Sequence, residues 1–254
     1  MTVLDWVAII GALAWTPHLV VLIRNWVTKP EVRIITEKNV QIGFTTFGSI
    51  FNLRIAFAVK NKDIVISEAK VRLKHESGEE RLLEWQGITQ HLGRMTMPDS
   101  GIMPHEKEYS VLAIKLTQKE IEERLVRFQE PSFIQSQKTY IDSAVKKMAY
   151  LKSEGKFEGE VFLREPEMTE LYSFNKHAFS WKQGKYKAII EVQSPESFNL
   201  IDNVREFTLT PLDIERLEKN KDQLEIDYKG LVLGYDQVKE NAEWQWCNPS
   251  LSKT

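Results

Sequence analysis

The sequence predicts a mainly β protein, in which an N-terminal transmembrane helix precedes an antiparallel β-sandwich with a two-helix insertion and a C-terminal helix. Three observations predict this fold class. A long uncharged run opens the chain, apolar residues then alternate with polar ones at the period of β-strands, and two later segments change to helical spacing. With 42% hydrophobic residues, 28% charged residues and a net charge of −2, the composition fits a folded protein and argues against a nucleic-acid surface.

The uncharged run extends from Trp6 to Ile23, with no charged residue between Asp5 and Arg24. At about 1.5 Å of rise per residue, a helix of this length spans roughly 27 Å, close to the ~30 Å of a hydrocarbon core. Trp6 and Trp26 flank the run, as interfacial tryptophans do in membrane proteins. The run therefore predicts a helix that crosses a bilayer.

From this run we expect a transmembrane anchor at residues 1–27, with residues 6–26 in contact with the lipid bilayer, and a juxtamembrane linker at 28–31. Pro17 and His18 fit poorly in the middle of a lipid-facing helix, so a buried or interfacial helix is an alternative. A cleaved signal peptide is the other alternative, although the start of the chain lacks the basic residues of a signal.

Charge on either side of the run predicts its orientation. Basic residues follow it closely, and they favour the cytoplasmic side of a cell membrane. We expect a single-pass protein with its N-terminus outside and its C-terminal domain in the cytoplasm. The lone Cys247 cannot form an intramolecular disulfide, which suits a reducing compartment, and a periplasmic domain is the alternative. The basic residues are Arg24, Lys29, Arg33 and Lys38.

The rest of the chain, residues 32–254, reads as one β-sandwich domain with a helical insertion at about 117–152. Half-buried strands are expected wherever apolar residues alternate with polar ones. Before the insertion these segments are 32–37, 53–59, 68–73, 81–85 and 109–116; after it they are 157–163, 185–192, 207–209 and 224–228.

Helical signals appear in three places. Thr117 and Glu120 have the spacing of a capping box, which predicts a helix that continues to about residue 128. A second helix is expected at 133–152, with an apolar stripe that should pack against the sheet or, alternatively, form a groove for a partner helix. Thr210 followed by Pro211 predicts the start of a C-terminal helix. The stripe consists of Ile141, Ala144, Val145, Met148 and Leu151.

The segment from Trp181 to Ala188, WKQGKYKA, resembles the tyrosine-corner sequence of immunoglobulin-like sandwiches. The resemblance implies that the hydroxyl of Tyr186 bonds back to the backbone upstream. It also places Ala188 where those domains carry their second cysteine, so the usual disulfide is absent. This resemblance implies a fold and no particular activity.

Two clusters of potential ligands are candidates for chemical sites. His91 and His105 enclose three methionines, a set of soft donors that could bind Cu(I), but their loop reads as a flexible connector. His75 lies near several acidic residues in a hairpin turn, where charges are normally solvated. The methionines are Met95, Met97 and Met103, and the acidic residues are Glu76, Glu79 and Glu80.

Other motifs of catalysis are missing from the sequence. It contains no GxxxxGK[ST], GxGxxG, GxSxG or HExxH motif. His177 has no companion nucleophile, and Cys247 follows Trp244 and Trp246 near the C-terminus, where paired tryptophans typically cover a core edge or contact a partner. We therefore expect no catalytic, cofactor or metal site.

These observations favour a membrane-anchored interaction or scaffold protein that presents its sandwich to an unknown protein partner. The alternatives are a periplasm-facing envelope or transport accessory and an enzyme whose residues form no recognisable motif.

Overall fold

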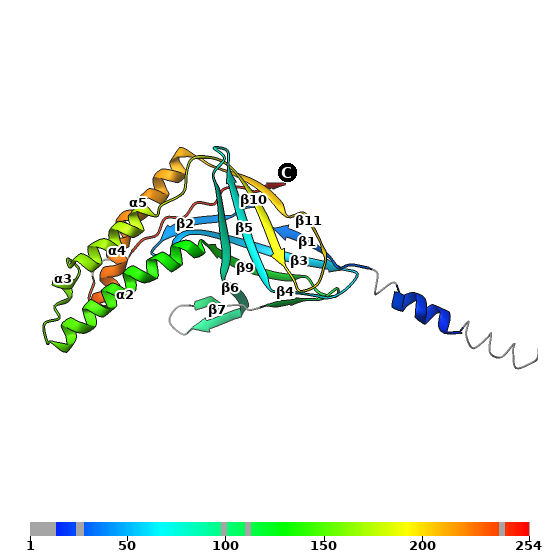
Figure 1. Cartoon of the computed structure of the whole chain (residues 1–254), viewed down its shortest axis with the longest axis horizontal. Coiled ribbons are helices and arrows are strands. Elements are labelled where there is room, and N and C mark those ends of the chain that lie inside the picture. The colour runs from blue at the N-terminus through cyan, green and yellow to red at the C-terminus, as the bar shows by residue number, and fades with distance from the viewer. Residues whose placement is uncertain (1–13, 24–27, 98–100, 110–112, 239–241, 254) are drawn as a thin grey trace, which may run out of the picture.

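The computed structural model describes residues 14–23, 28–97, 101–109, 113–238 and 242–253, with only the backbone described between 88 and 112. Its dominant feature is one mixed sheet of eleven strands, curled into a half-barrel (Figure 1). The fold is mainly β, as predicted, and is compatible with a β-sandwich. The main path of the sheet runs in the order β11-β1-β3-β9-β6-β5-β10-β12-β13, with β2 paired to β3, β7 paired to β6, and a separate pair β4-β8.

The strand bounds follow the alternating pattern of the sequence closely in most places. They are β1 Glu31–Thr36, β2 Gln41–Thr45, β3 Gly48–Lys60, β4 Ile64–Ile66, β5 Glu68–His75, β6 Glu80–Met97, β7 Gly101–Tyr109, β8 Ile114–Leu116, β9 Glu122–Gln129, β10 Gly184–Gln193, β11 Asn199–Ile201, β12 Val204–Leu209 and β13 Ser252–Lys253.

The concave face of the half-barrel is filled by side chains. In β1, β5 and β10 the buried residues occupy alternate positions, as expected for strands with one face toward the core. Three phenylalanines, Phe51, Phe57 and Phe128, are among the largest side chains that are completely buried. This packed interior accounts for the stability of the sheet through the removal of apolar surface from water.

The two ends of the curled sheet meet along a seam between β1 and β12. β11 pairs in parallel with β1 and leads through Asp202 directly into β12. Beside this turn the Arg205 side chain, only 3% exposed, donates to the Thr36 hydroxyl at 2.8 Å and to the Ile34 carbonyl at 3.1 Å. Arg205 therefore bridges two strands that have no backbone ladder between them in the described pairings.

Three helices form an arm that projects from one end of the half-barrel (Figure 1). They are α2 Pro131–Ser153, α4 Pro166–His177 and α5 Pro211–Leu233, with the single-turn α3 Gly159–Phe162 between α2 and α4. The arm has its own small core, separate from that of the sheet, built around Ala144, Phe162, Met168, Leu171 and Tyr228. The predicted helix at 133–152 is confirmed as α2.

The apolar stripe of α2 does not pack against the sheet, as we predicted it would. Ala144, Met148 and Leu151 belong to the core of the arm, against the other helices. Ile141 and Val145 lie outside that core and are 36% and 49% exposed. The stripe is wider than the contact made by α4 and α5, so one side of it remains in water.

Three local predictions in this region are wrong. The expected helix at 117–128 is replaced by strand β9, in which Val126 and Phe128 are buried at a spacing of two between β3 and β6. The expected strand at 157–163 contains α3, and the one at 224–228 lies within α5. The helical insertion accordingly spans 131–177, later than the predicted 117–152.

The predicted transmembrane helix is also wrong. The described part of the first helix covers residues 14–23, and ten residues at about 1.5 Å each reach roughly 15 Å, half of a hydrocarbon core. Within the described ranges, no helix is both long and apolar enough to cross a membrane. Residues 1–13 and 24–27 of the predicted anchor lie outside the described residues. The single-pass location at a cell membrane, with its predicted orientation, is therefore not supported.

The local geometry implied by the tyrosine-corner resemblance is present. The Tyr186 hydroxyl donates to the Lys182 carbonyl at 3.0 Å and accepts from the Lys182 amide at 2.9 Å. The Tyr186 ring is buried and stacks on Phe207 of β12 with a centroid distance of 5.0 Å. This contact fixes the loop that returns the chain from the arm to β10.

Candidate functional site

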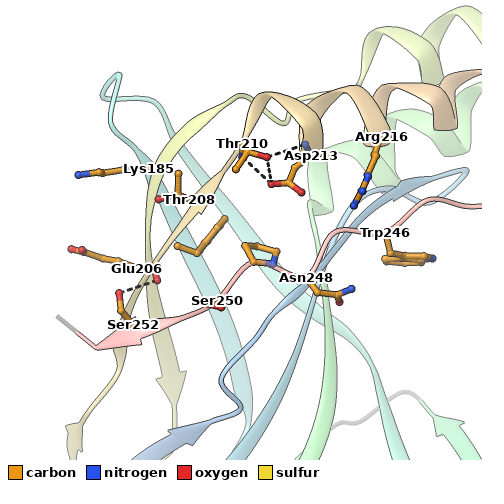
Figure 2. Close-up of a pocket in the computed structure, with 12 residues that line it drawn as sticks. Lys185, Glu206, Thr208, Thr210, Asp213, Arg216, Trp246, Asn248, Ser250 and Ser252 are labelled. Carbon is orange, nitrogen blue, oxygen red and sulfur yellow. Dashed lines mark hydrogen bonds between the residues drawn. The ribbon is translucent and has the colours of Figure 1, made fainter.

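A groove of about 750 Å³ lies between β12, the first turns of α5 and the C-terminal segment (Figure 2). We call the C-terminal segment, residues 243–253, the strap. The groove is open to solvent, and most of its lining residues are polar. They are Lys185, Glu206, Phe207, Thr208, Thr210, Asp213, Arg216, Trp246, Asn248, Pro249, Ser250 and Ser252.

One wall of the groove is the outer edge of β12. The Ile190 amide of the β10 side donates to the Asn203 carbonyl at 2.8 Å, which fixes the phase of the antiparallel ladder between β10 and β12. Because such bonds alternate along a strand, the backbone groups of Glu206 and Thr208 point away from β10. Glu206 pairs there with Ser252 of the strap.

The opposite wall is the strap, whose other edge is bonded to β2 and the residues before it. Cys247 and Ile42 exchange two backbone hydrogen bonds of 2.8 and 2.9 Å. Further along, the Val40 amide donates to the Pro249 carbonyl at 3.1 Å. By the same alternation, the backbone groups of Ser250 point toward β12.

The groove exists because these two edges separate after one short stretch of pairing. Continuing the register of Glu206 with Ser252 would place Thr208 opposite Ser250, but no backbone bond joins those residues in the described structure. The chain leaves β12 at Thr210, which caps α5 in a reciprocal capping box with Asp213. The start of α5 therefore pulls the chain away from the strap.

The strap is fixed from beneath by a buried side chain of α5. Asn220 is fully buried, and its amide nitrogen donates to the carbonyls of Phe44 at 2.9 Å and Gln245 at 2.8 Å. Its carbonyl oxygen accepts from the Gln245 amide at 2.7 Å. Trp246 then lies over Gly43, where a Cβ atom would overlap the indole ring. The wall formed by the strap is thus rigidly placed.

The two charged side chains of α5 that line the groove differ in their contacts: Asp213 is hydrogen-bonded, whereas Arg216 forms no ion pair among the described residues. Burial would raise the pKa of Asp213, but hydrogen bonds from the Thr210 hydroxyl and amide outweigh it, so the pKa lies below its usual value. Figure 2 shows the Arg216 side chain reaching from α5 toward Asn248 and Trp246 of the strap. Among the described residues Arg216 has no ion-pair partner within 4.0 Å. Its charge contributes to lowering the pKa of Asp213, and Lys185 is the other cation that lines the groove.

Cys247 belongs to the strap, and its side chain is buried in the main core, where it is chemically protected. Its thiol is 2% exposed and donates to the Asp213 carbonyl at 3.4 Å. Burial, together with the nearby Asp213, raises the pKa of this thiol to about 12. The group therefore keeps its proton in the folded state at pH values where a free thiol, with a pKa near 8.5, begins to ionise.

We expect Cys247 in the folded protein to react with a thiol reagent at pH 8 at least about 100-fold more slowly than in urea-unfolded protein. The raised pKa also means that stability is unaffected below about pH 8.5 and decreases as pH rises from there toward 12, because only the unfolded state then loses the proton. Labelling kinetics with and without urea provide the measurement. Equal rates in the two conditions would show that the thiol is not buried in the folded protein.

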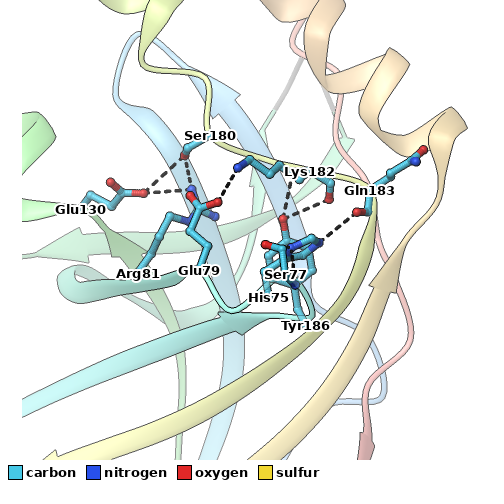
Figure 3. A network of polar contacts seen from close by, with 9 residues as sticks. All are labelled: His75, Ser77, Glu79, Arg81, Glu130, Ser180, Lys182, Gln183 and Tyr186. Carbon is cyan, nitrogen blue, oxygen red and sulfur yellow. Dashed lines mark hydrogen bonds and ion pairs between the residues drawn. The ribbon is translucent and has the colours of Figure 1, made fainter.

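A second polar cluster joins the arm to the half-barrel (Figure 3). Arg81 of β6 has a side chain that is only 10% exposed; it donates to Glu130 at 3.0 Å and to the Ser180 hydroxyl. Its guanidinium carbon lies 4.3 Å from the centre of the Trp181 ring. Glu130 is the N-cap of α2, and Ser180 lies between α4 and β10. Arg81 therefore binds both the residue at which the helical insertion begins, Glu130, and a residue just after it ends, Ser180, which is a structural role.

The acidic residues near His75 do not converge on its ring. The Nε2 atom of His75 donates to the Gln183 carbonyl at 2.9 Å, and Nδ1 lies 2.8 Å from the Ser77 hydroxyl. Glu79 pairs instead with Lys182, and that hydrogen bond lowers the pKa of Glu79. Glu80 pairs with Lys74. These contacts brace the hairpin turn against the loop that precedes β10.

The remaining candidates from the sequence do not form a site among the described residues. Nδ1 of His177 contacts the Ser173 carbonyl within α4 at 2.7 Å. Trp244 packs on the main core, as expected for a tryptophan that covers a core edge. Met95 and Met103 are opposite each other in the β6–β7 hairpin, but the side chains of the methionine and histidine cluster lie outside the described residues. Among the described residues, no group of three or more potential metal ligands is present.

The residues of the groove were missed in the sequence because none of them forms a motif. Thr208, Ser250 and Arg216 come from three segments and have ordinary polar side chains. The only signals were the helix start at Thr210 and the tryptophans of the strap. Comparison with protein-family models, with curated proteins and with solved structures gave no match to this chain.

Proposed function

We propose that this chain is a protein-interaction module without catalytic activity, and that it binds a protein partner at the groove beside the strap. The observation that carries the proposal is the pairing gap in the groove, where backbone groups of Thr208 and Ser250 face each other without a ladder. Unpaired strand edges readily bind other chains.

Two further observations support binding over catalysis. In the polar clusters around His75 and Arg81, the carboxylates of Glu79, Glu80 and Glu130 are each paired with a cation, although one terminal nitrogen of Arg81 has no hydrogen-bond partner. A catalytic site needs at least one group free to act on a substrate, with its pKa adjusted to that task. The tyrosine corner adds a fold-level analogy to immunoglobulin-like sandwiches, which present edges and loops to partners.

The proposal is tested by affinity capture of the tagged full chain from an extract of its source cells, followed by mass spectrometry. We expect Arg216→Glu to reduce recovery of the bound protein at least about tenfold, because it reverses the positive charge at one end of the groove. The matched control is Lys219→Glu, since Lys219 is exposed on the same helix and lies outside the groove lining.

Both variants should show the circular dichroism and urea midpoint of the unchanged protein. Recovery of the same proteins in equal amounts with all three chains would contradict a role for the groove. Recovery of no protein with any of them would contradict an interaction function.

A further inference from the structure

We propose that the groove binds an extended segment of the partner by strand addition to the free edge of β12 at Thr208. This inference rests on the proposed function and specifies the conformation that the partner adopts. The recognition would be made largely by backbone hydrogen bonds, with side chains of the bound segment alternating between the groove and solvent.

The edge of β12 is covered everywhere except along the groove. Near its start, the Arg205 guanidinium donates to the carbonyls of Asp202 at 2.9 Å and Val204 at 2.7 Å. The next outward-facing residue, Glu206, is paired with Ser252, whose hydroxyl also donates to the Glu206 carbonyl at 3.4 Å. Thr208 is the first outward-facing residue beyond these contacts, and it is exposed.

This edge is thus covered by two groups, the Arg205 side chain and Ser252 of the strap, and is open beyond them. Proteins commonly protect sheet edges with charges, bulges or covering segments, because a free edge pairs with other chains. Here the strap covers β12 as far as Glu206 and then crosses to β2, although its next outward-facing residue, Ser250, lies in register with Thr208. A bound strand would complete the ladder at that point.

The dimensions suit a short segment. From Glu206 to Thr210 the chain advances four residues, roughly 14 Å at about 3.4 Å per residue. That length holds four to five residues of an extended partner. The residue opposite Thr208 is the one that can exchange backbone hydrogen bonds with β12, because Glu206 is paired with Ser252 and the Thr210 amide donates to Asp213. The narrow end is blocked by the pairing of Glu206 with Ser252, and the far end is bounded by the capped first turn of α5.

The walls also indicate one preferred side chain. Arg216 reaches toward the strap at the far end of the groove and has no ion-pair partner among the described residues (Figure 2). The Asp213 carboxylate near it is held by the Thr210 cap. We therefore expect an acidic side chain in the bound segment, placed opposite Arg216.

A pair of substitutions at one residue separates backbone recognition from side-chain recognition. Thr208→Pro removes the amide hydrogen that faces the groove, while the ladder to β10 is retained because it uses the neighbouring residues. Thr208→Val keeps the amide hydrogen and changes only the hydroxyl. The probes are peptides selected from a phage-displayed library of random ten-residue sequences on the full chain, then synthesised and titrated by calorimetry.

We expect selected peptides to contain an acidic residue. Their affinity should fall at least about tenfold with Thr208→Pro and less than about threefold with Thr208→Val. N-methylation of the peptide backbone should weaken binding at alternate positions only. If Thr208→Pro lowers the urea midpoint, hydrogen exchange in the unchanged protein replaces it: the Thr208 amide should gain at least about tenfold protection on peptide binding.

Affinities unchanged by Thr208→Pro, or lowered equally by both substitutions, would overturn strand addition, as would a library without any groove-dependent peptide. Such results are distinguishable from failure of the proposed function. A partner whose capture depends on Arg216 but whose binding leaves the Thr208 amide unprotected would support an interaction role and reject the extended conformation.

Discussion

Replacing Arg205 by methionine is expected to lower the free energy of unfolding by about 4 kcal/mol, the largest single effect we anticipate. The guanidinium makes four hydrogen bonds. Two cross the seam of the half-barrel to the Thr36 hydroxyl and the Ile34 carbonyl, and two go to the Asp202 and Val204 carbonyls of its own segment. Methionine fills much of the same volume but leaves those acceptors without their donors. Burial lowers the pKa of Arg205, partly offset by the nearby Asp202. Arginine stays charged in proteins, so the buried cation needs these acceptors as hydrogen-bond partners.

The measurement is urea unfolding of the full chain, followed by tryptophan fluorescence and by circular dichroism. The matched control is Lys253→Met, which removes a positive charge 3.8 Å from Asp202 but from a side chain that is 69% exposed. That substitution should change stability by less than about 0.5 kcal/mol. Similar losses for both variants would show that charge near Asp202, and not the hydrogen bonds across the seam, explains the effect.

Most of the sheet could be predicted from sequence, because period-two alternation directly reports which residues face the core. It identified β3, β5 and β10, and the capping signals at Thr210 located the start of α5. The same kind of capping signal was misleading at Thr117. There, pairing of β9 with both β3 and β6 outweighs the local helix preference and buries Val126 and Phe128.

The arm was harder to predict because α2 and α4 pack mainly on each other and on the last turns of α5, while the first half of α5 packs on the sheet. Phe157, Val161 and Leu163 alternate as in a strand. In the structure the neighbours Phe162 and Leu163 are both in the core of the arm, whereas Val161 is 54% exposed. Short apolar segments cannot be assigned by periodicity alone. The exposure of Ile141 and Val145 likewise depends on how much of α2 is covered by α4 and α5.

The groove could not be predicted from sequence because it depends on the hydrogen-bonding register of two separate strand pairings, which decides which backbone groups face the groove. One joins β12 to β10, and the other joins the strap to residues 38–42. Their relative position determines that Thr208 and Ser250 face each other without bonding. No local pattern in either segment carries this information, whereas Trp246 and Pro249 only mark the strap as a segment that packs.

The position of the strap depends on Asn220, and Asn220→Ala is expected to lower the free energy of unfolding by about 3 kcal/mol. Alanine leaves three backbone groups without their partner: the Phe44 carbonyl and both the amide and carbonyl of Gln245. Because two of the three groups belong to the strap, the loss should weaken the strap more than the half-barrel. The single cysteine makes this distinction measurable, since Cys247 lies two residues beyond Gln245.

If the whole loss falls on the strap, labelling of Cys247 at pH 8 should accelerate by up to about 100-fold, since 1.4 kcal/mol corresponds to a factor of ten. Lys219→Ala, a change at an exposed position of α5, should leave both stability and labelling unchanged. A destabilised Asn220→Ala protein whose thiol stays protected would mean that strap and sheet unfold together. Faster labelling would instead show that the strap detaches while the rest of the protein stays folded. Peptide affinity should then also fall in this variant, because detachment of the strap leaves β12 as the only wall of the groove.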